Sequence, residues 1–300
     1  MTNLKFLKTT ISAVALSLAL YESARAADTG SCGTNCTYNY DPTTQTLTFT
    51  GTGANGAGVI SKSTHDYGLS GTVKNTIVSE GITDILYDYG SYPYGRSALR
   101  DIGASDGKLV LPQSLRNLGP DSMHLLRFGT IEINSKNLQA DNYNFRFLGQ
   151  EVTIVMSEDA NFNFNTNSFY PNGNNTAYAS KLNILCKGNP DNCKAKFGNS
   201  LDAMDQSTIN LEYYKEYDKK GNLLLQYNND GYDEYDAKGN IIAKYDTNGN
   251  LRYVKDVNGA EYTYDKNGNL SKATKRGPFT IPEANALTKD GPVNTVTITW

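Results

Sequence analysis

The sequence has few of the residues from which active sites are usually built. Only two of the 300 residues are histidines, and neither His65 nor His124 lies in a recognisable catalytic motif. The chain contains no Gly-x-Ser-x-Gly, no His-Glu-x-x-His and no phosphate-binding loop. Neighbouring carboxylates such as Glu158 and Asp159 are explained by a solvated acidic surface. We therefore predict a protein that is not an enzyme and uses no cofactor, with a glycan hydrolase built on unlinked carboxylates as the alternative.

Long apolar runs and basic clusters are missing as well. After residue 26 no stretch approaches the roughly 18 apolar residues that a transmembrane helix requires, so we expect no membrane-spanning helix. The 28 Lys and Arg residues are scattered and are outnumbered by 31 Asp and Glu, which argues against a nucleic-acid partner. A single Trp, four Met and a mean hydropathy of −0.51 argue against the large core of an α/β enzyme.

Residues 1–26 have the three regions of a secretory signal peptide. A basic start is followed by an apolar segment, 11–20, and by a small-x-small cleavage pattern at 24–26. The apolar segment is too short to span a bilayer, and a buried N-terminal helix is the alternative. Cleavage would remove three basic residues and one acidic residue, which changes the formal net charge from −3 to about −5. We expect the mature chain to be secreted, displayed on the outer surface or retained in the periplasm.

Four cysteines form two pairs that are close in sequence, Cys32 with Cys36 and Cys186 with Cys193. Export would permit disulfides, and four cysteines allow three connectivities. Pairing within each close pair is our first expectation. A zinc site is the alternative, but it would need further Cys or His ligands, and both histidines lie far from the two pairs in sequence.

The residues that are abundant predict a β-rich chain with many turns. There are 33 Asn, 27 Gly and 21 Tyr; Tyr suits pleated, half-buried surfaces, whereas Asn and Gly suit turns. Residues 30–53 alternate between apolar and polar in two halves, which predicts a hairpin of two short strands. Residues 54–76 are rich in Gly and Ser and are typical of a loop.

A looser repeat follows this loop. Apolar residues stand at offsets 0, 4 and 7 in 78–85 and again in 111–118, and short apolar strands are expected at 131–133, 152–155 and 182–185. Two successive intervals are 22 residues, and the flanking intervals are 33 and 30. A short strand in each period near 22 residues predicts a solenoid, in which stacking builds a core that one repeat cannot bury alone. An irregular β-sandwich is the alternative.

Two phrases in this half resemble BspA-type leucine-rich-repeat surface proteins of bacteria. The segment from Cys32 to Gly53, with Cys-Gly-x-Asn leading to Leu-Thr-Phe-Thr-Gly-Thr-Gly, resembles their N-terminal entry module. The segment 109–118 resembles their repeat of a strand, Pro and x-x-Leu-x-x-Leu. The resemblance covers about residues 30–197, and it implies a leucine-rich-repeat-like solenoid with an N-terminal β-hairpin cap and a role in surface binding.

One seven-residue phrase, Tyr-Asp-x-x-Gly-Asn-(Leu/Ile), occurs four times. Its copies begin at Tyr217, Tyr235, Tyr245 and Tyr264. A Gly beside Asn or Asp recurs every 8 to 10 residues from 221 to 268, and such dipeptides favour type I′ hairpin turns. The segments between them are strand-like, so we predict a β-meander or β-spiral over 213–270.

The phrase resembles the YD repeats of Rhs-type bacterial surface proteins. The units here are short, and about 30 residues follow Leu270, so the resemblance implies a short stalk or sheet without a toxin domain. The expected fold is mainly β, and the chain is divided as follows: signal peptide 1–26, entry module and loop 27–73, degenerate leucine-rich-repeat solenoid 74–197, connector 198–212, YD-like β-array 213–270, and C-terminal capping or sorting strand 271–300.

The acidic turns of the array suggest a second use as calcium loops. Asp246 and Asp265 each begin an Asp-x-Asn-Gly-Asn segment, which places oxygen groups at alternate positions. A loop of the EF-hand kind also needs a bidentate Glu at its twelfth position, where this chain has Val257 or Arg276. We therefore predict no metal site.

Repeats combined with export and missing catalytic motifs predict a binding protein. Exposed tyrosines offer large contact areas at low entropic cost, and the candidate binding residues are Tyr227, Tyr235, Tyr245, Tyr253 and Tyr262. The expected partner is a protein or glycan ligand on host or neighbouring cells, and exposed strand edges would allow self-association. A stalk or envelope component without a specific ligand is the first alternative, and the glycan hydrolase is the second.

Overall fold

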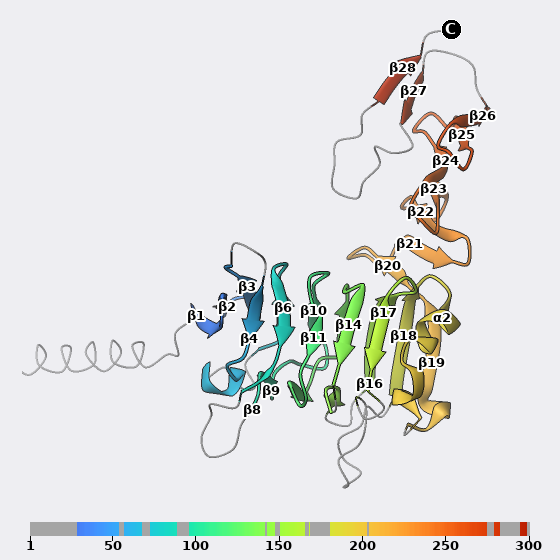
Figure 1. The fold of residues 1–300 in the computed structure, drawn as a ribbon. Helices are drawn as coiled ribbons and strands as arrows, with labels where there is room; N and C mark the ends of the chain where they lie inside the picture. Colours follow the sequence, from blue (N-terminus) through green and yellow to red (C-terminus); the bar gives the residue numbers. More distant parts are fainter. Residues whose placement is uncertain are drawn as a thin grey trace, which may run out of the picture.

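The computed structural model describes residues 29–53, 57–67, 73–88, 96–141, 143–147, 151–165, 168, 181–202, 204–274, 279–282 and 295–298. These residues are mainly β, as predicted, and they form several sheets, none of which closes on itself (Figure 1). The predicted signal peptide lies outside the described residues. Within the described ranges, none of the helices has the length and apolar character needed to cross a membrane.

The largest sheet has nine strands. Its strands, in spatial order, are β1 (Thr29–Gly33), β2 (Cys36–Asp41), β3 (Thr46–Gly51), β5 (Asn75–Val78), β10 (Lys108–Leu111), β13 (Thr130–Ile133), β16 (Glu151–Ser157), β18 (Lys181–Lys187) and β19 (Ile209–Tyr213). The first three pair antiparallel, which confirms the predicted hairpin as β2 and β3 and adds β1 at the edge. From β3 onward all neighbours are parallel and follow chain order.

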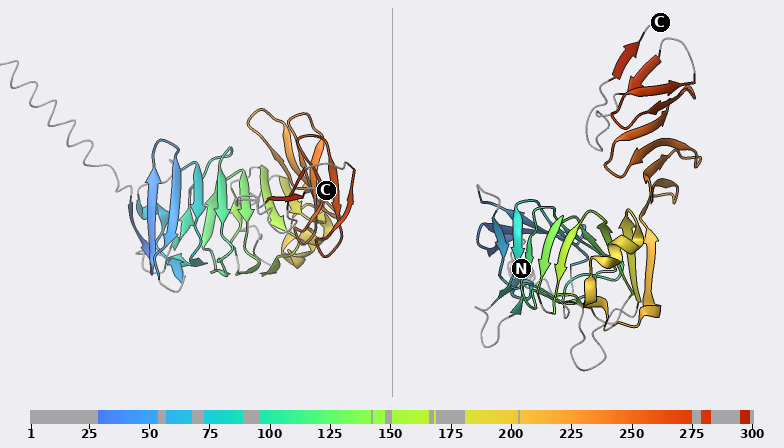
Figure 2. Two further views of the ribbon diagram at one scale, coloured as in Figure 1. Left: turned by 90° about the horizontal axis from the view of Figure 1, so that it is seen from above. Right: turned by 45° about the vertical axis from the view of Figure 1, so that its right-hand side comes forward.

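Two smaller parallel sheets accompany the large one. One contains β4 (Gly58–Ile60), β6 (Ile82–Ile85), β11 (Asn117–Leu118), β14 (Asn137–Ala140) and β17 (Asn161–Phe164), and the other contains β9 (Leu99–Arg100), β12 (Met123–Leu126) and β15 (Arg146–Phe147). A separate pair consists of β7 (Tyr87–Asp88) and β8 (Arg96–Ser97). Both views of Figure 2 show the strands side by side in chain order, so successive chain segments add strands to more than one sheet.

The strand registers account for most of the spacing found in the sequence, but the predicted interval from Ile133 to Val155 is wrong by one residue, because Glu132 lies opposite Val155. Leu109 pairs with Ile131, Ile131 with Ile154, and Ile154 with Ile184, and all four side chains are fully buried. These pairs are 22, 23 and 30 residues apart, so the repeat of apolar positions is a repeat of stacked core positions. Stacking like residues in adjacent strands fills one continuous core between the sheets.

The two matching phrases at 78–85 and 111–118 lie next to each other. Strand β5 pairs with β10 and β6 pairs with β11, both in parallel. The residues at offsets 0, 4 and 7 are all buried: Val78, Ile82 and Ile85 in the first phrase, and Leu111, Leu115 and Leu118 in the second. The predicted core positions of this repeat are therefore confirmed.

The cysteines pair locally, as expected, and form Cys32–Cys36 and Cys186–Cys193 disulfides. The zinc alternative is wrong because both pairs are oxidised. Cys193 lies on α2 (Pro190–Ala195), whose cap residue Asn189 accepts a hydrogen bond from the Asp191 backbone N–H at 2.9 Å through its side-chain oxygen. Proline at the first helical position also favours this start, because its missing N–H would have no helical partner there.

The large sheet continues beyond the expected end of the solenoid at 197. Two short 3₁₀ segments, η2 (Gly198–Leu201) and η3 (Gln206–Thr208), follow α2. Strand β19 then pairs with β18 inside the segment 198–212 that the sequence analysis assigns to a connector. We call residues 29–214 the body.

The segment 215–273 forms a seven-stranded antiparallel meander, which confirms the predicted β-meander. Its strands, in chain and spatial order, are β20 (Lys215–Tyr217), β21 (Leu223–Asn228), β22 (Gly231–Tyr235), β23 (Ile241–Asp246), β24 (Leu251–Lys255), β25 (Glu261–Tyr264) and β26 (Leu270–Ala273). We call residues 215–273 the array. The described part of 271–300 contains the end of β26 and a separate hairpin of β27 (Phe279–Pro282) and β28 (Thr295–Ile298).

Candidate functional site

The repeated phrase of the array forms one kind of turn. Around Asp236, the carboxylate accepts hydrogen bonds from the backbone N–H of Lys238 at 2.8 Å and from the backbone and side-chain N–H groups of Asn240 at 2.9 Å each. The Gly239 N–H donates to the Asp236 carbonyl at 2.9 Å, and Gly239 has a φ of +81°. A left-handed residue closing a three-residue loop needs glycine, because other residues are strained there.

Type I′ turns are therefore the wrong prediction for these loops. A type I′ turn needs positive φ at two consecutive residues, whereas glycine alone is left-handed in each described repeat turn. The same Asp-to-N–H pattern recurs at Asp218, Asp246, Asp256 and Asp265. The oxygens that suggested calcium loops thus accept hydrogen bonds from their own turns.

These hydrogen bonds favour the ionised aspartates. Donation from the side chain and backbone of the asparagine four residues on holds the pKa of Asp218 and Asp236 below its ordinary value. The same two groups lower the pKa of Asp265, with the backbone N–H acting most strongly. Formation of these turns is sufficient to explain the Asp, Gly and Asn positions of the repeated phrase, without a role in ligand binding.

A ladder of tyrosine rings runs across the first strands of the array. Tyr227 lies opposite Tyr232, and Tyr232 lies opposite Tyr245, on one face of β21, β22 and β23. Ring centroids are 5.2 Å apart in the first pair and 4.4 Å apart in the second, where the rings are stacked. Tyr214 extends the ladder toward the body, 6.1 Å from Tyr227. Partial burial raises the pKa of Tyr214 and of Tyr232 to about 12, so these phenols are neutral at physiological pH.

The five predicted binding tyrosines do not form one exposed surface. Tyr245 is 7% exposed and Tyr262 is fully buried, so the expectation of exposure is wrong for both. They belong to the small core of the array, where they pack with Leu251, Tyr264 and two alanines. Tyr253 lies opposite Lys244 and Thr263, which puts it outside this core. Tyr235 is likewise partly exposed and outside it.

Among the five predicted binding tyrosines, Tyr227 lines a cavity. A cavity of about 210 Å³ lies between the C-terminal end of the body and the array. On the body side it is lined by residues that follow β16 and end β18, and on the array side by β21, β22 and the turn after β23. We call it the junction cavity.

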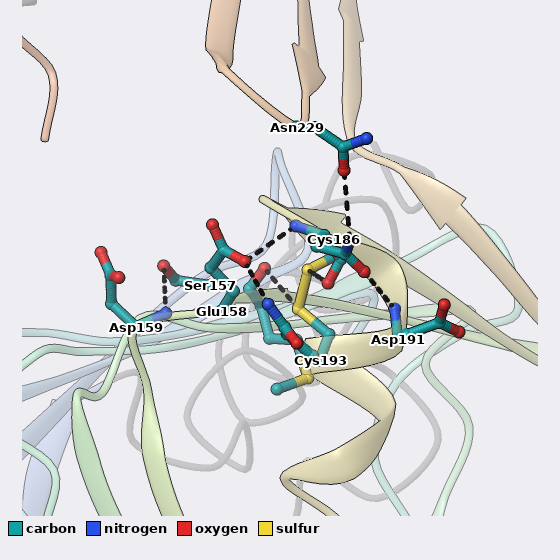
Figure 3. Close-up of a disulfide and its surroundings, with 10 residues drawn as sticks. Ser157, Glu158, Asp159, Cys186, Asp191, Cys193 and Asn229 are labelled. Atoms are coloured by element: carbon teal, nitrogen blue, oxygen red, sulfur yellow. Dashed lines mark hydrogen bonds between the residues drawn. A yellow bond between two sulfur atoms is a disulfide. The ribbon is translucent and has the colours of Figure 1, made fainter. Parts of the chain in front are cut away.

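Glu158 orders the body side of the junction cavity by accepting hydrogen bonds from the loop that follows β18. Its Oε2 accepts hydrogen bonds from the Asn189 backbone N–H at 3.0 Å and from the Asn192 side chain at 2.9 Å (Figure 3). Gly188 has a φ of +134°, and a Cβ there would lie 2.3 Å from Cδ of Glu158. Glycine is therefore required for both the backbone conformation and the close approach of this carboxylate.

The Cys186–Cys193 disulfide closes the loop between β18 and α2, which contacts the array. Within this loop, the Asn189 side-chain N–H donates to Oδ1 of Asn229 at 3.2 Å (Figure 3). The Tyr213 hydroxyl donates to the same oxygen at 2.8 Å. Because Asn229 lies in the β21–β22 turn, the disulfide restricts the loop that contacts the β21–β22 hairpin of the array.

Two charged residues at the cavity already have partners. Lys187 places its ammonium 3.0 Å from Glu132 Oε1 and 5.0 Å from the centre of the Tyr214 ring. Partial burial opposes ionisation of Glu132, but its hydrogen bonds and ion pairs with Lys108 and Lys187 hold its pKa below the ordinary value. On the array side, Asp246 pairs with Arg252.

Sequence reasoning missed Tyr214 and Tyr232 of the ladder, and it assigned Glu158 and Asp159 only to a solvated surface. Tyr232 had a usable signal, because it mirrors Tyr227 across a short Asn-Asp loop and such positions face each other in a hairpin. Glu158 and Asp159 are about seventy residues away from the tyrosines in sequence, and only the fold brings them together.

Comparisons of the chain with known protein families, with curated proteins and with solved structures find no match. The resemblances to BspA-type and YD-repeat proteins therefore stay predictions. Function has to be inferred from the junction cavity and the tyrosine ladder.

Proposed function

We propose that this protein is an exported, non-enzymatic binding protein that recognises a ligand on host or neighbouring cells. The observation that carries the proposal is the junction cavity, where Tyr227 and Tyr232 face the polar groups that follow β16 and β18. Ligand sites commonly combine aromatic or apolar walls with a few fixed polar groups. Tyrosine suits such walls, because it offers contact area and a hydrogen-bonding hydroxyl with little rotamer entropy to lose.

We also propose that the parallel sheets of the body form a leucine-rich-repeat-like solenoid of the BspA type, followed by a YD-like array. The support is the parallel pairing of the matching phrases 78–85 and 111–118 and the buried ladder through Leu109, Ile131 and Ile154. In such proteins each repeat contacts its neighbours and contributes to an extended surface. A binding role fits an extended surface better than it fits a single enclosed active site.

Export is supported by the two disulfides, which persist in oxidising compartments, and by the expected signal peptide. A test of location is cell fractionation combined with protease treatment of intact cells. Digestion of the protein on intact cells supports display on the outer surface, and protection until the envelope is opened supports periplasmic residence. Recovery only in the cytoplasm would contradict export.

A binding role is favoured over catalysis by the state of the polar groups. The ladder phenols are neutral at physiological pH, and the turn aspartates accept hydrogen bonds from backbone N–H groups. General bases need a pKa near the working pH and an available lone pair. The hydrolase alternative predicts turnover of glycans that a single carboxylate substitution abolishes.

A structural role is the second candidate, and the last strand of the array favours it. All four residues of β26 are exposed, and β26 pairs with β25 alone among the described strands. Exposed edges can pair with strands of another chain. This alternative predicts self-association, measured by light scattering, in a protein that binds none of the ligands offered.

The binding proposal is tested with the mature protein on a panel of immobilised glycans and matrix proteins. We expect binding at micromolar protein, and we expect Tyr227→Ala to weaken it by at least about tenfold, because interface tyrosines commonly contribute more than 1 kcal/mol. Tyr217→Ala is the matched control, since Tyr217 is 55% exposed and lies outside the cavity lining. Circular dichroism checks that both variants fold. Failure to bind any member of the panel would contradict the proposal.

A further inference from the structure

Two carboxylates at the junction cavity have no cationic partner among the described residues. The cavity lining includes Glu158, Asp159, Asp246 and Lys187. Asp246 pairs with Arg252, and Lys187 pairs with Glu132. Glu158 accepts hydrogen bonds only from neutral groups of the described residues, through Oε2. The uncompensated negative charge therefore belongs to Glu158 and Asp159.

Asp159 is the more available of the two carboxylates. Its backbone N–H donates to the Ser157 hydroxyl at 3.3 Å, whereas its exposed carboxylate accepts no hydrogen bond from a described residue. Figure 3 shows this carboxylate pointing away from the disulfide loop. Burial, the Glu216 charge and the Asp159 charge all raise the pKa of Tyr227, in decreasing order of strength. The Asp159 carboxylate therefore interacts electrostatically with the opposite wall of the cavity.

Within the tyrosine wall, the ring of Tyr232 has a neighbouring tyrosine on each side. Strands β21 and β23 flank β22, so Tyr227 and Tyr245 lie on either side of Tyr232 at 5.2 and 4.4 Å. A cation that needs the free face of an aromatic ring finds the faces of Tyr232 already covered. Ring edges and phenol oxygens instead suit a ligand with several hydrogen-bonding groups.

The remaining lining residues have the same character. Ser157 contributes a hydroxyl, Thr247 a second hydroxyl and Asn248 an amide, and the two array residues are exposed. The volume of about 210 Å³ is below the roughly 300–1,000 Å³ of pockets for drug-sized ligands, so it suits one sugar ring. A compact unit that carries donors around its whole edge fits this set of groups.

We propose that the junction cavity binds an amino-sugar unit of a glycan, with its ammonium at Asp159 and Glu158 and its hydroxyls at the tyrosine and Asn248 wall. This inference rests on the binding function proposed above and names the ligand class of that site. Uronic and sialic acids are excluded because their carboxylates would face Glu158 and Asp159. A lysine side chain supplies the ammonium but no hydroxyls, so it would leave the polar groups of the array wall unpaired.

The test measures binding of four small probes to the mature protein by ligand-observed NMR and calorimetry. The probes are glucosamine, methyl glucoside, glucuronate and Nα-acetyl-lysine amide. We expect glucosamine to bind with a dissociation constant of the order of 1 mM, which is usual for a single ring, and about tenfold more tightly than glucuronate. Methyl glucoside should fall between them.

The variant Asp159→Asn removes one charge and keeps the shape of the side chain. We expect it to weaken glucosamine binding about tenfold and methyl glucoside binding much less, since hydrogen bonds to charged groups are the stronger ones. Asp191→Asn is the matched control, because Asp191 is exposed on α2 and outside the cavity lining. It should leave all four affinities within about twofold of the original, as is usual for distant surface sites.

The outcomes test the amino-sugar assignment and the proposed binding function separately. Equal binding of glucuronate and glucosamine, an unchanged affinity in Asp159→Asn, or tighter binding of the lysine amide would each overturn the amino-sugar assignment. If the panel of glycans and matrix proteins still yields a ligand, the binding function stands without it. If neither the probes nor the panel bind, both proposals fail.

Discussion

The body and the array bury their side chains in different ways. The body encloses one continuous core of aliphatic residues between parallel sheets, including Ile131, Ile154 and Ile184. The array is a single meander whose small core consists largely of tyrosines, with Leu251 and Tyr262 fully buried in it. Its loops are fixed by carboxylates that accept N–H hydrogen bonds.

This difference shows two ways of stabilising a β-structure that is rich in repeats. Aliphatic burial stabilises the body at every pH and depends on shape and volume. The buried tyrosines stabilise the array as neutral phenols, and the turn aspartates stabilise it as ionised carboxylates. The array is therefore expected to respond to alkaline pH through its tyrosines and to single changes in its turns.

The largest expected effect is loss of the array fold at alkaline pH. Burial raises the pKa of the array residues Tyr232 and Tyr264 to about 12, above the unfolded value of about 10. The stability that these neutral phenols contribute is thus complete below about pH 10 and is lost as the pH rises through about 12. We expect the array to unfold within this window, measured by tyrosinate absorbance and by circular dichroism.

A phenylalanine substitution checks the cause of alkaline unfolding. Tyr264→Phe removes an ionisable hydroxyl from a buried ring and should move the transition to higher pH. Tyr217→Phe, at an exposed position, should leave it unchanged. An alkaline transition that neither variant moves would show that the phenols are not responsible.

A cavity in the body should have a large effect that stays in the body. Ile154 is fully buried and pairs with Ile131 and Ile184, so Ile154→Ala should lower the free energy of unfolding by about 2–5 kcal/mol. Hydrogen exchange read by mass spectrometry should rise in peptides from 108–187 and stay unchanged in 223–273. Equal increases in both regions would show that body and array unfold as one unit. Glu212→Ala, exposed on β19, is the control.

The smallest expected effect concerns one turn of the array. Gly239 has a φ of +81° and open space around its Cα, so Gly239→Ala tests backbone strain without a clash. We expect a loss of about 1–2 kcal/mol in array stability, measured by denaturant unfolding. Gly239→Asn should lose less, because asparagine tolerates the left-handed region. Equal losses for Ala and Asn would contradict a strain mechanism.

Local chemistry could be predicted where neighbours in sequence are neighbours in space. The disulfides, the hairpin at 30–53, the core offsets of 78–85 and the meander over 213–270 all depend on short separations. The type I′ assignment failed because the carboxylate of Asp236 selects a longer loop with one left-handed glycine.

The candidate site was harder to predict because it depends on distant segments. Tyr227 and Tyr245 are similar in sequence context, yet one lines the junction cavity and the other fills the array core. Strand alternation assigns a side chain to a face, but only the packing of the sheets decides whether that face is covered.

The sequence by itself determined the β-class and the meander, because each follows from periodicity or from contacts within a few residues. It favoured the local cysteine pairing without fixing it. The tertiary structure alone decided that Glu158 and Asp159 face the tyrosine ladder. It did so by stacking β18 and β19 at the end of the body and by fixing the Cys186–Cys193 loop against the β21–β22 hairpin of the array. A cavity between two segments has no signature in either one, since its shape and charge arise from how they pack.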